Sequence, residues 1–287
     1  TDYRYGDRMN TFNKQKNIIP FNLTKREYYL HIFNFRDFNF IKKQNLGNAY
    51  KFLENLRSIK LFNKFHKDTS IRAVVLRGAG KAFCAGHDLK QMTEARKQKD
   101  GGAAIFKDLF DRCASFMQTV QNIPQPVIAQ VHGIATAAGC QLVATCDLAI
   151  AAENTKFGVN GVNIGLFCST PMVALSRNIN RKRAFEMLVT GEFMEAEEAK
   201  VIGLINKVVP EKELLSATAS LAEIISKKLG SAVKTGKMAF YQQIQMPTED
   251  AYKYTGKVMV QNMLNKDTEE GIAAFIDKRD PKWSQDQ

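Results

Sequence analysis

The chain has 287 residues, 45% hydrophobic and 24% charged, which is typical of a soluble globular protein with one large domain, alone or with an appendage. Its formal net charge of +12 favours anionic partners such as phosphates, nucleic acid or acidic lipid without choosing among them, and a solvated basic surface explains it equally well. No run of eighteen uninterrupted apolar residues occurs, which argues against a membrane-spanning helix.

The first 47 residues are basic and aromatic, with nine Lys and Arg against four Asp and Glu. Residues 28–33 in this segment have the aromatic and β-branched composition of a strand. From Asn48 onward, apolar residues recur every three or four positions, which predicts an amphipathic helix ending near Lys67. Its apolar positions are Phe52, Leu53, Leu56, Ile59, Phe62 and Phe65.

Strands and helices alternate after this helix. The pattern predicts short buried strands at 71–77, 126–131, 148–152 and 207–209. It predicts helices at 103–121, 137–146, 172–178, 182–189 and 196–201, and a run of helices over 211–280. This order implies an α/β body followed by a helical C-terminal part.

Two helix starts contain residues of the kind that cap helices. Asp267, with Glu270 three residues later, predicts a capped start for the last helix. Ser169 or Thr170, immediately before Pro171, predicts a cap for the helix that follows.

The five cysteines form neither a CxxC pair nor an even-numbered disulfide framework. Three of them lie among small apolar residues, which favours buried free thiols in a reducing compartment. We therefore expect no metal centre. The cysteines are Cys84, Cys113, Cys140, Cys146 and Cys168.

The glycine-rich turn at residues 78–81 does not fit either common nucleotide-binding motif. A phosphate loop requires Gly where this chain has Val75, and Ser or Thr where it has Ala82. The dinucleotide fingerprint requires a third Gly where this chain has Phe83.

Two small-residue stretches fit an oxyanion site instead: residues 85–87 in a turn and residues 137–139 at a helix start. Backbone N–H groups at such places stabilise a carbonyl oxygen as it gains negative charge. Small side chains allow a ligand to approach these amides closely. Close helix packing requires the same small residues, so that alternative stays open.

Four ordered blocks resemble the enoyl-CoA hydratase/isomerase (crotonase) superfamily. They are KAFCAGHDLKQM, HGIATAAGCQLVATCDLAIAAENTKFG, TGEFMEAEEAKVIGLINKVVP and EEGIAAFIDKR. The resemblance implies an α/β crotonase spiral of ββα turns over residues 48–210 and a helical, trimer-forming region over 211–287, whereas residues 1–47 match poorly. It further implies an acyl-CoA thioester as ligand with no separate cofactor, a role in the fatty acid metabolism of mitochondria, and a homotrimer or dimer of trimers.

The resemblance also assigns roles to individual residues. It places the two oxyanion amides on His87 and Ala138, and adenine and phosphate contacts near Ala85, Lys81 and Lys90. Two lysines beside a phosphorylated nucleotide would act as point charges. Phe275 and Lys278 correspond to C-terminal residues that contribute to the CoA site, often across a subunit boundary.

The chain departs from the family at both glutamates that activate water in the hydratases. Gln141 occupies the first position and Gly161 the second. A Gln amide does not exchange a proton near neutral pH, and Gly has no side chain. We therefore expect hydratase activity, a lyase reaction, to be weak or absent.

Other reactions and roles stay open. Decarboxylation or thioester cleavage through the oxyanion hole alone would suit the Ala85-Gly86-His87-Asp88 sequence, and a non-catalytic CoA-binding or assembly protein is a further alternative. Asp88 and Asn163 are interpreted as turn or packing residues, and Cys168 lacks a motif-linked base. A nucleic-acid partner is not expected, because charge is its only support.

Overall fold

A parallel five-stranded sheet forms the centre of the fold in the computed structural model, which describes residues 29–34, 49–78 and 80–284. The strand order is β1-β2-β3-β5-β8, and each neighbouring pair is parallel. The strands are β1 (Tyr29–Asn34), β2 (Ile71–Arg77), β3 (Val127–Val131), β5 (Leu148–Ala152) and β8 (Lys207–Val209). All five strand predictions are confirmed to within one residue, including the one in the poorly matched N-terminal segment.

A second, smaller sheet lies beside the first. It consists of β4 (Ile134–Thr136), β6 (Lys156–Gly158) and β7 (Met194–Glu195), in the order β4-β6-β7. Cys84 extends it by pairing with Ala135 in a single parallel bridge. The chain thus makes successive ββα turns, β3-β4-α5 and then β5-β6-α6, and the expected crotonase spiral is confirmed.

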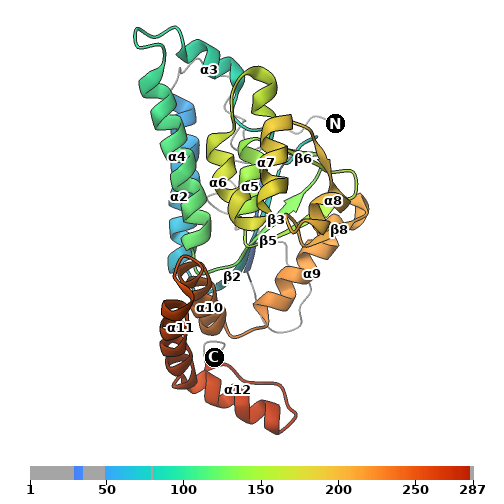
Figure 1. The fold of residues 1–287 in the computed structure, drawn as a ribbon. Coiled ribbons are helices and arrows are strands. Elements are labelled where there is room, and N and C mark those ends of the chain that lie inside the picture. Colours follow the sequence, from blue (N-terminus) through green and yellow to red (C-terminus); the bar gives the residue numbers. More distant parts are fainter. Residues whose placement is uncertain (1–28, 35–48, 79, 285–287) are drawn as a thin grey trace, which may run out of the picture.

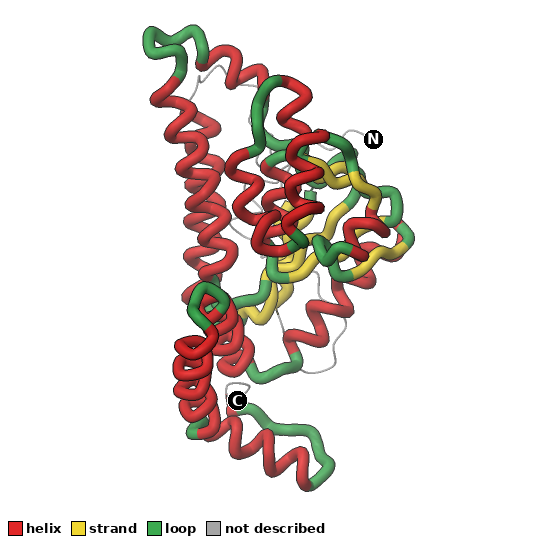
Figure 2. The backbone as a smooth tube through the Cα atoms, viewed as in Figure 1, coloured by secondary structure: helices red, strands yellow, loops and turns green. Residues whose placement is uncertain are grey.

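Helices surround the strands (Figure 2). They are α2 (Ala49–Lys67), α3 (Leu89–Ala95), α4 (Ala103–Asn122), α5 (Ala138–Thr145), α6 (Ser169–Asn178), α7 (Arg181–Thr190), α8 (Ala196–Val201), α9 (Leu214–Ser226), α10 (Gly230–Gln243), α11 (Thr248–Met263) and α12 (Lys266–Ile276). Short 3-10 turns lie at η2 (Asn160–Ile164) and η3 (Glu211–Glu213). The predicted run of C-terminal helices is therefore confirmed.

The core has unequal halves on the two faces of the main sheet. One face packs against α2, α4, α5 and α6, with Phe62 and Phe116 in edge-to-face contact at 5.4 Å. The other face packs against α9, where Ala222 covers Val75 and Ile128. Because helices cover both faces, the strands consist almost entirely of buried apolar residues, as expected for a parallel sheet.

A buried ion pair connects α10 to this body. The Lys237 ammonium donates to Asp147 Oδ2 at 2.7 Å and to the carbonyl oxygens of Val120 and Gln125 at 3.1 and 3.0 Å. The Tyr241 hydroxyl donates to the other carboxylate oxygen of Asp147 at 2.8 Å. Beyond this anchor, α11 and α12 lead away from the sheet (Figure 1).

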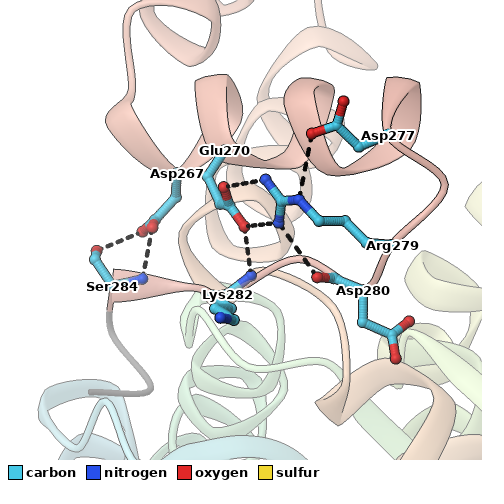
Figure 3. Close-up of polar contacts among 7 residues, drawn as sticks. All are labelled: Asp267, Glu270, Asp277, Arg279, Asp280, Lys282 and Ser284. Carbon is cyan, nitrogen blue, oxygen red and sulfur yellow. Dashed lines mark hydrogen bonds and ion pairs between the residues drawn. The ribbon is translucent and has the colours of Figure 1, made fainter.

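The segment after α12 folds back along the helix and is held by two carboxylates (Figure 3). Glu270 accepts two hydrogen bonds from Arg279, at 2.6 and 2.9 Å, and one from the Lys282 amide at 2.7 Å. Asp267 accepts from the Ser284 amide at 2.6 Å and from its hydroxyl at 2.8 Å. These two carboxylates hold the tail against the first turns of α12.

Both predicted helix caps are wrong. The N-cap of α12 is Asn265, whose side chain accepts from the Asp267 amide at 2.9 Å, because Ser284 already engages the Asp267 carboxylate. Helix α6 already includes Ser169, and its N-cap residue Cys168 makes no side-chain capping bond. The Ser169 hydroxyl donates to the Phe167 carbonyl instead.

Candidate functional site

The turn that follows β2 is joined to β4 by backbone hydrogen bonds. The Phe83 amide donates to the His132 carbonyl at 3.0 Å, and the Cys84 amide donates to the Ile134 carbonyl at 3.1 Å. In return, the Thr136 amide donates to the Cys84 carbonyl at 3.0 Å. Residues 83–84 therefore run alongside β4. This pairing places residues 85–87 next to the start of α5.

The two predicted small-residue stretches lie against each other. Gly86 has φ of +87°, and a Cβ at this position would lie 3.0 Å from Ala137 Cβ and 3.5 Å from the Ala138 nitrogen. A Cβ on Gly139 would lie 2.1 Å from the Cys84 carbonyl oxygen. Glycine is required at residue 86 because of its left-handed φ, and at residue 139 because the Cys84 backbone approaches too closely for a side chain.

The amides at this junction are available to a ligand. Ala138 is the first residue of α5, and Ala137 before it has φ of +51° and no side-chain capping bond. Within the described part of the chain, neither the His87 amide nor the Ala138 amide donates to a protein acceptor. Free N–H groups at a helix N-terminus attract negative charge, so the geometry suits a carbonyl oxygen that develops charge.

The His87 ring lies in a largely apolar environment. It contacts Phe110 edge to face, with ring centroids 5.7 Å apart. Burial lowers the pKa of His87, so the ring is neutral at pH 7. Its buried Nε2 has no hydrogen-bond partner among the described residues.

The two polar residues interpreted as structural have structural partners. Asp88 is the N-cap of α3 and accepts from the Lys90 amide at 2.9 Å. The Asn163 side chain donates to the Gly191 carbonyl at 3.2 Å. Both contacts agree with roles in turns and packing.

Gln141 lies one helical turn after Ala138 on the same face of α5. It is 4% exposed, and its Oε1 has no partner among the described residues. The Gln141 amide is therefore buried within the first two turns of α5. It supplies polarity there but no ionisable group.

Gly161 lies in η2, in a space closed to any side chain. A Cβ there would lie 2.2 Å from the Leu166 carbonyl oxygen and 2.8 Å from the Cys168 sulfur. The neighbouring Asn160 side chain accepts from the Thr136 hydroxyl at 2.7 Å, which connects η2 to the residues just before α5. The connection has no signal in the sequence because its residues are 24 positions apart, and the closure depends on the irregular path of the chain from Gly161 to Leu166.

The remaining predicted residues form two separate groups. Ala85, Lys81 and Lys90 are exposed on or next to the turn after β2. Phe275, 85% exposed, and Lys278 lie at the end of α12, at the opposite end of the molecule from α3 (Figure 1). Within one chain, the structure does not bring these two groups together.

The described residues contain no group of three or more His, Cys, Asp or Glu side chains that could hold a metal ion. None of the described helices is long and apolar enough to cross a membrane. The five cysteines are free thiols, all buried except the partly buried Cys84.

The fold, and the contact between residues 85–87 and the start of α5, agree with one class of protein. The family model described as enoyl-CoA hydratase/isomerase matches residues 49–286, and the chain belongs to this family. Among curated relatives, the mitochondrial enoyl-CoA hydratase domain-containing protein 3 of Xenopus laevis is 46% identical over 217 residues, which are 76% of this chain and 72% of that protein. The human protein of the same name is 43% identical over 243 residues, covering 85% of this chain and 78% of its own length.

Solved structures agree with this assignment. The crystal structure of human enoyl-CoA hydratase domain-containing protein 3 matches with a TM-score of 0.76 and 40% identity, covering 81% of this chain and 90% of that one. An enoyl-CoA hydratase of Mycobacterium smegmatis also matches with a TM-score of 0.76, at 50% identity, over 80% of this chain and 88% of its own. The chain is thus an enoyl-CoA hydratase-like member of the crotonase family.

Proposed function

We propose that the protein binds an acyl-CoA thioester, holding its carbonyl oxygen with the His87 and Ala138 amides, and that it catalyses hydration weakly or not at all. The observation that carries this proposal is the combination of two free amides with a closed space at Gly161. The chain keeps the groups that polarise a carbonyl, and it has no room for a side chain at the second position where the family's hydratases have a proton-transferring glutamate.

The free amides support binding of the carbonyl. Two donors aimed at one oxygen, one of them at a helix N-terminus, stabilise charge that develops on that oxygen. The close approach of Gly86 to the Ala138 nitrogen keeps both donors at one place. A thioester carbonyl is the acceptor that family membership suggests.

The absence of carboxylates argues against hydration. Adding water to a double bond requires a base for the water and an acid for the neighbouring carbon. Gln141 can do neither at neutral pH, and no side chain fits at residue 161 without displacing the Leu166 carbonyl. The neutral, partly buried His87 ring makes edge contact with Phe110, and no described group orients it as a base.

The rest of the ligand site would be completed by a second copy of the chain. Lys81 and Lys90 provide exposed cations near the turn for the phosphates of CoA. Phe275 and Lys278 would reach the same ligand from a neighbouring subunit of a trimer, and apolar residues exposed on and between α11 and α12 support such contacts. These residues are Met259, Val260, Met263, Leu264, Ile272, Phe275 and Ile276. The relatives' names are those of mitochondrial proteins, and an acyl-CoA ligand would place the protein in fatty acid metabolism.

Two measurements on the full chain test the proposal. Calorimetry with butyryl-CoA should show binding, and free CoA should bind more weakly because it lacks the carbonyl. Crotonyl-CoA should show no sustained loss of its enoyl absorbance at catalytic protein concentrations. Sustained turnover at ordinary hydratase rates, or the absence of butyryl-CoA binding, would overturn the proposal.

A second candidate is decarboxylation or thioester cleavage. Both reactions develop negative charge on the thioester oxygen, and both could use the amides of His87 and Ala138 without the missing glutamates. Release of carbon dioxide from malonyl-type CoA esters, or of free CoA from acyl-CoA, would identify it. Binding with neither product would favour a non-catalytic CoA-binding protein.

A further inference from the structure

A groove lies between the end of α9, helix α10 and the starts of β3 and β5. Its volume is about 410 Å³, which is within the range of small-molecule sites. Figure 1 shows α10 near the foot of α4, away from α3. The groove is therefore separate from the His87 and Ala138 amides, which lie beyond the carboxyl ends of β2 and β4.

The walls of this groove are apolar, and the polar residues on its buried side already have partners. The apolar lining residues are Pro126, Leu148, Ile225, Val233 and Phe240, of which Phe240 is 54% exposed. On the buried side, the Asp147 carboxylate accepts from Lys237, from the Tyr241 hydroxyl and from the Val127 amide. Because this ion pair is neutral overall and hydrogen-bonded, a ligand in the groove would contact mainly apolar surface.

Gly236, in the interior of α10, also lines the groove and leaves it open. Glycine in a helix interior lowers the stability of the helix relative to alanine. No close contact requires glycine here, because a Cβ on Gly236 would meet nothing within 4 Å. The chain thus keeps a residue without a side chain where a larger one would fit. An open space kept at a cost to the helix favours an occupant.

The unpaired charge at the edge of the groove is positive. Lys228, exposed two residues after α9, lines the groove and has no carboxylate partner in the described part of the chain. By contrast, Lys227 is paired with Glu223 at 2.7 Å, and Lys237 is paired with Asp147 at 2.7 Å. A cation beside an apolar groove is complementary to a molecule that has an apolar body and an anionic head.

We propose that this groove binds a single-chain amphipathic anion, whose alkyl chain lies along the apolar wall and whose carboxylate pairs with Lys228. Four of the five apolar lining residues are aliphatic, which favours an alkyl chain over a flat aromatic ring system. The site uses none of the residues that hold the thioester. The inference therefore stands apart from the proposed function.

Calorimetry with decanoate, below its micelle concentration, tests the proposal on the full chain. We expect one saturable site per chain, and saturating butyryl-CoA should leave the decanoate affinity unchanged. Gly236→Leu should lower this affinity by about ten-fold or more, because its side chain replaces part of the bound alkyl chain. Gly256→Leu is the matched control, since residue 256 on α11 is equally unhindered but lies outside the groove.

Lys228→Gln tests the contact with the head group. It should weaken decanoate binding by about three-fold, as expected for an exposed ion pair, and leave the affinity for decanol unchanged because decanol has no charge. Lys227→Gln, which removes a cation already paired with Glu223, should bind decanoate like the unmodified chain. This pair of exposed substitutions keeps the test available if Gly236→Leu does not fold.

The outcomes separate the groove from the thioester site and from a subunit contact. Absence of saturable decanoate binding would overturn the proposal, and so would equal losses in Gly236→Leu and Gly256→Leu. Displacement of decanoate by butyryl-CoA would place the chain at the oxyanion amides instead. A smaller oligomer of Gly236→Leu in sedimentation, with no decanoate binding to the unmodified chain, would assign the groove to a second copy of the protein.

Discussion

Gly161 and Cys168 share a space that holds one side chain and not two. The sulfur lies 2.8 Å from the place of a Cβ on residue 161, and the Leu166 carbonyl closes the same space at 2.2 Å. A glutamate placed at residue 161 would therefore require the 166–168 segment to move. The backbone therefore excludes a side chain at residue 161.

Gly161→Ala should lower the free energy of unfolding by about 2 kcal/mol, because a methyl group is forced against a backbone carbonyl and a sulfur. Denaturant unfolding measures this directly. Gly256→Ala is the matched control, since the same methyl group on α11 meets nothing within 4 Å and should be neutral or stabilising by up to about 1 kcal/mol. Equal effects of the two substitutions would contradict the closed space.

If the proposed function holds, removing the Ala138 N–H should weaken binding of the thioester selectively. Ala137 has φ of +51°, which glycine adopts without strain, so Ala137→Gly is a suitable background. Adding Ala138→Pro removes the N–H at the first position of α5, where proline is tolerated. Butyryl-CoA affinity should fall about ten-fold by calorimetry, the loss of roughly one hydrogen bond, and free CoA affinity should stay unchanged.

Arg181→Pro provides the control for the Ala138→Pro substitution, because it places a proline at the first position of another helix. Arg181 is the first residue of α7, and Asn180 before it has φ of −55° and ψ of 135°, a conformation compatible with a following proline. This variant should bind both ligands like the unmodified chain. An equal loss of butyryl-CoA and CoA affinity in the Ala138→Pro variant would argue against a carbonyl contact at this amide.

Lys237→Met should destabilise the protein by about 3 kcal/mol or more, because it leaves the Asp147 carboxylate buried without its cation. Lys234→Met, on an exposed position of the same helix, should change stability by less than about 0.5 kcal/mol. Adding Asp147→Asn to Lys237→Met should recover part of the lost stability, since no buried carboxylate is then left without its cation. Comparable losses for the two lysine variants would refute a buried anchor.

The sequence predicts elements well where their pattern is local. The strand at 71–77 and the helix at 103–121 follow from runs of apolar residues at strand or helix spacing, and both are confirmed. Strands β4 and β6 have three residues each, too few for any period to show. Contacts between distant residues, such as Lys237 with Asp147, leave no local pattern at all.

The same limit applies to the candidate site. Small residues at 85–87 and 137–139 predict turns that approach closely, and Gly86 does lie against Ala138. Asp267 has the right side chain for a helix cap, yet Ser284, seventeen residues later, takes up its carboxylate and leaves the cap to Asn265. A local motif shows which partner a residue can have, and the fold decides which partner it does have.

The tail after α12 should loosen in acid through Glu270. The Arg279 guanidinium, with the Lys282 amide, lowers the pKa of Glu270 to about 2, against 4.5 for the free group. Because the folded-state pKa is the lower one, the carboxylate stabilises the tail fully above pH 4.5, and this contribution is lost as pH falls from 4.5 toward 2. Trp283, the chain's one tryptophan, lies against Gly271, so its fluorescence should change across this range.

Substitutions distinguish Glu270 from the other carboxylates that titrate in acid. Glu270→Gln should show the loosened-tail fluorescence already at pH 7, because an amide keeps the shape but loses the ion pair with Arg279. Asp277→Asn removes only the longer, exposed contact to Arg279 at 3.4 Å and should keep the unmodified acid response. A Glu270→Gln variant with unchanged Trp283 fluorescence at pH 7 would show that the tail is held by the Asp267–Ser284 contacts alone.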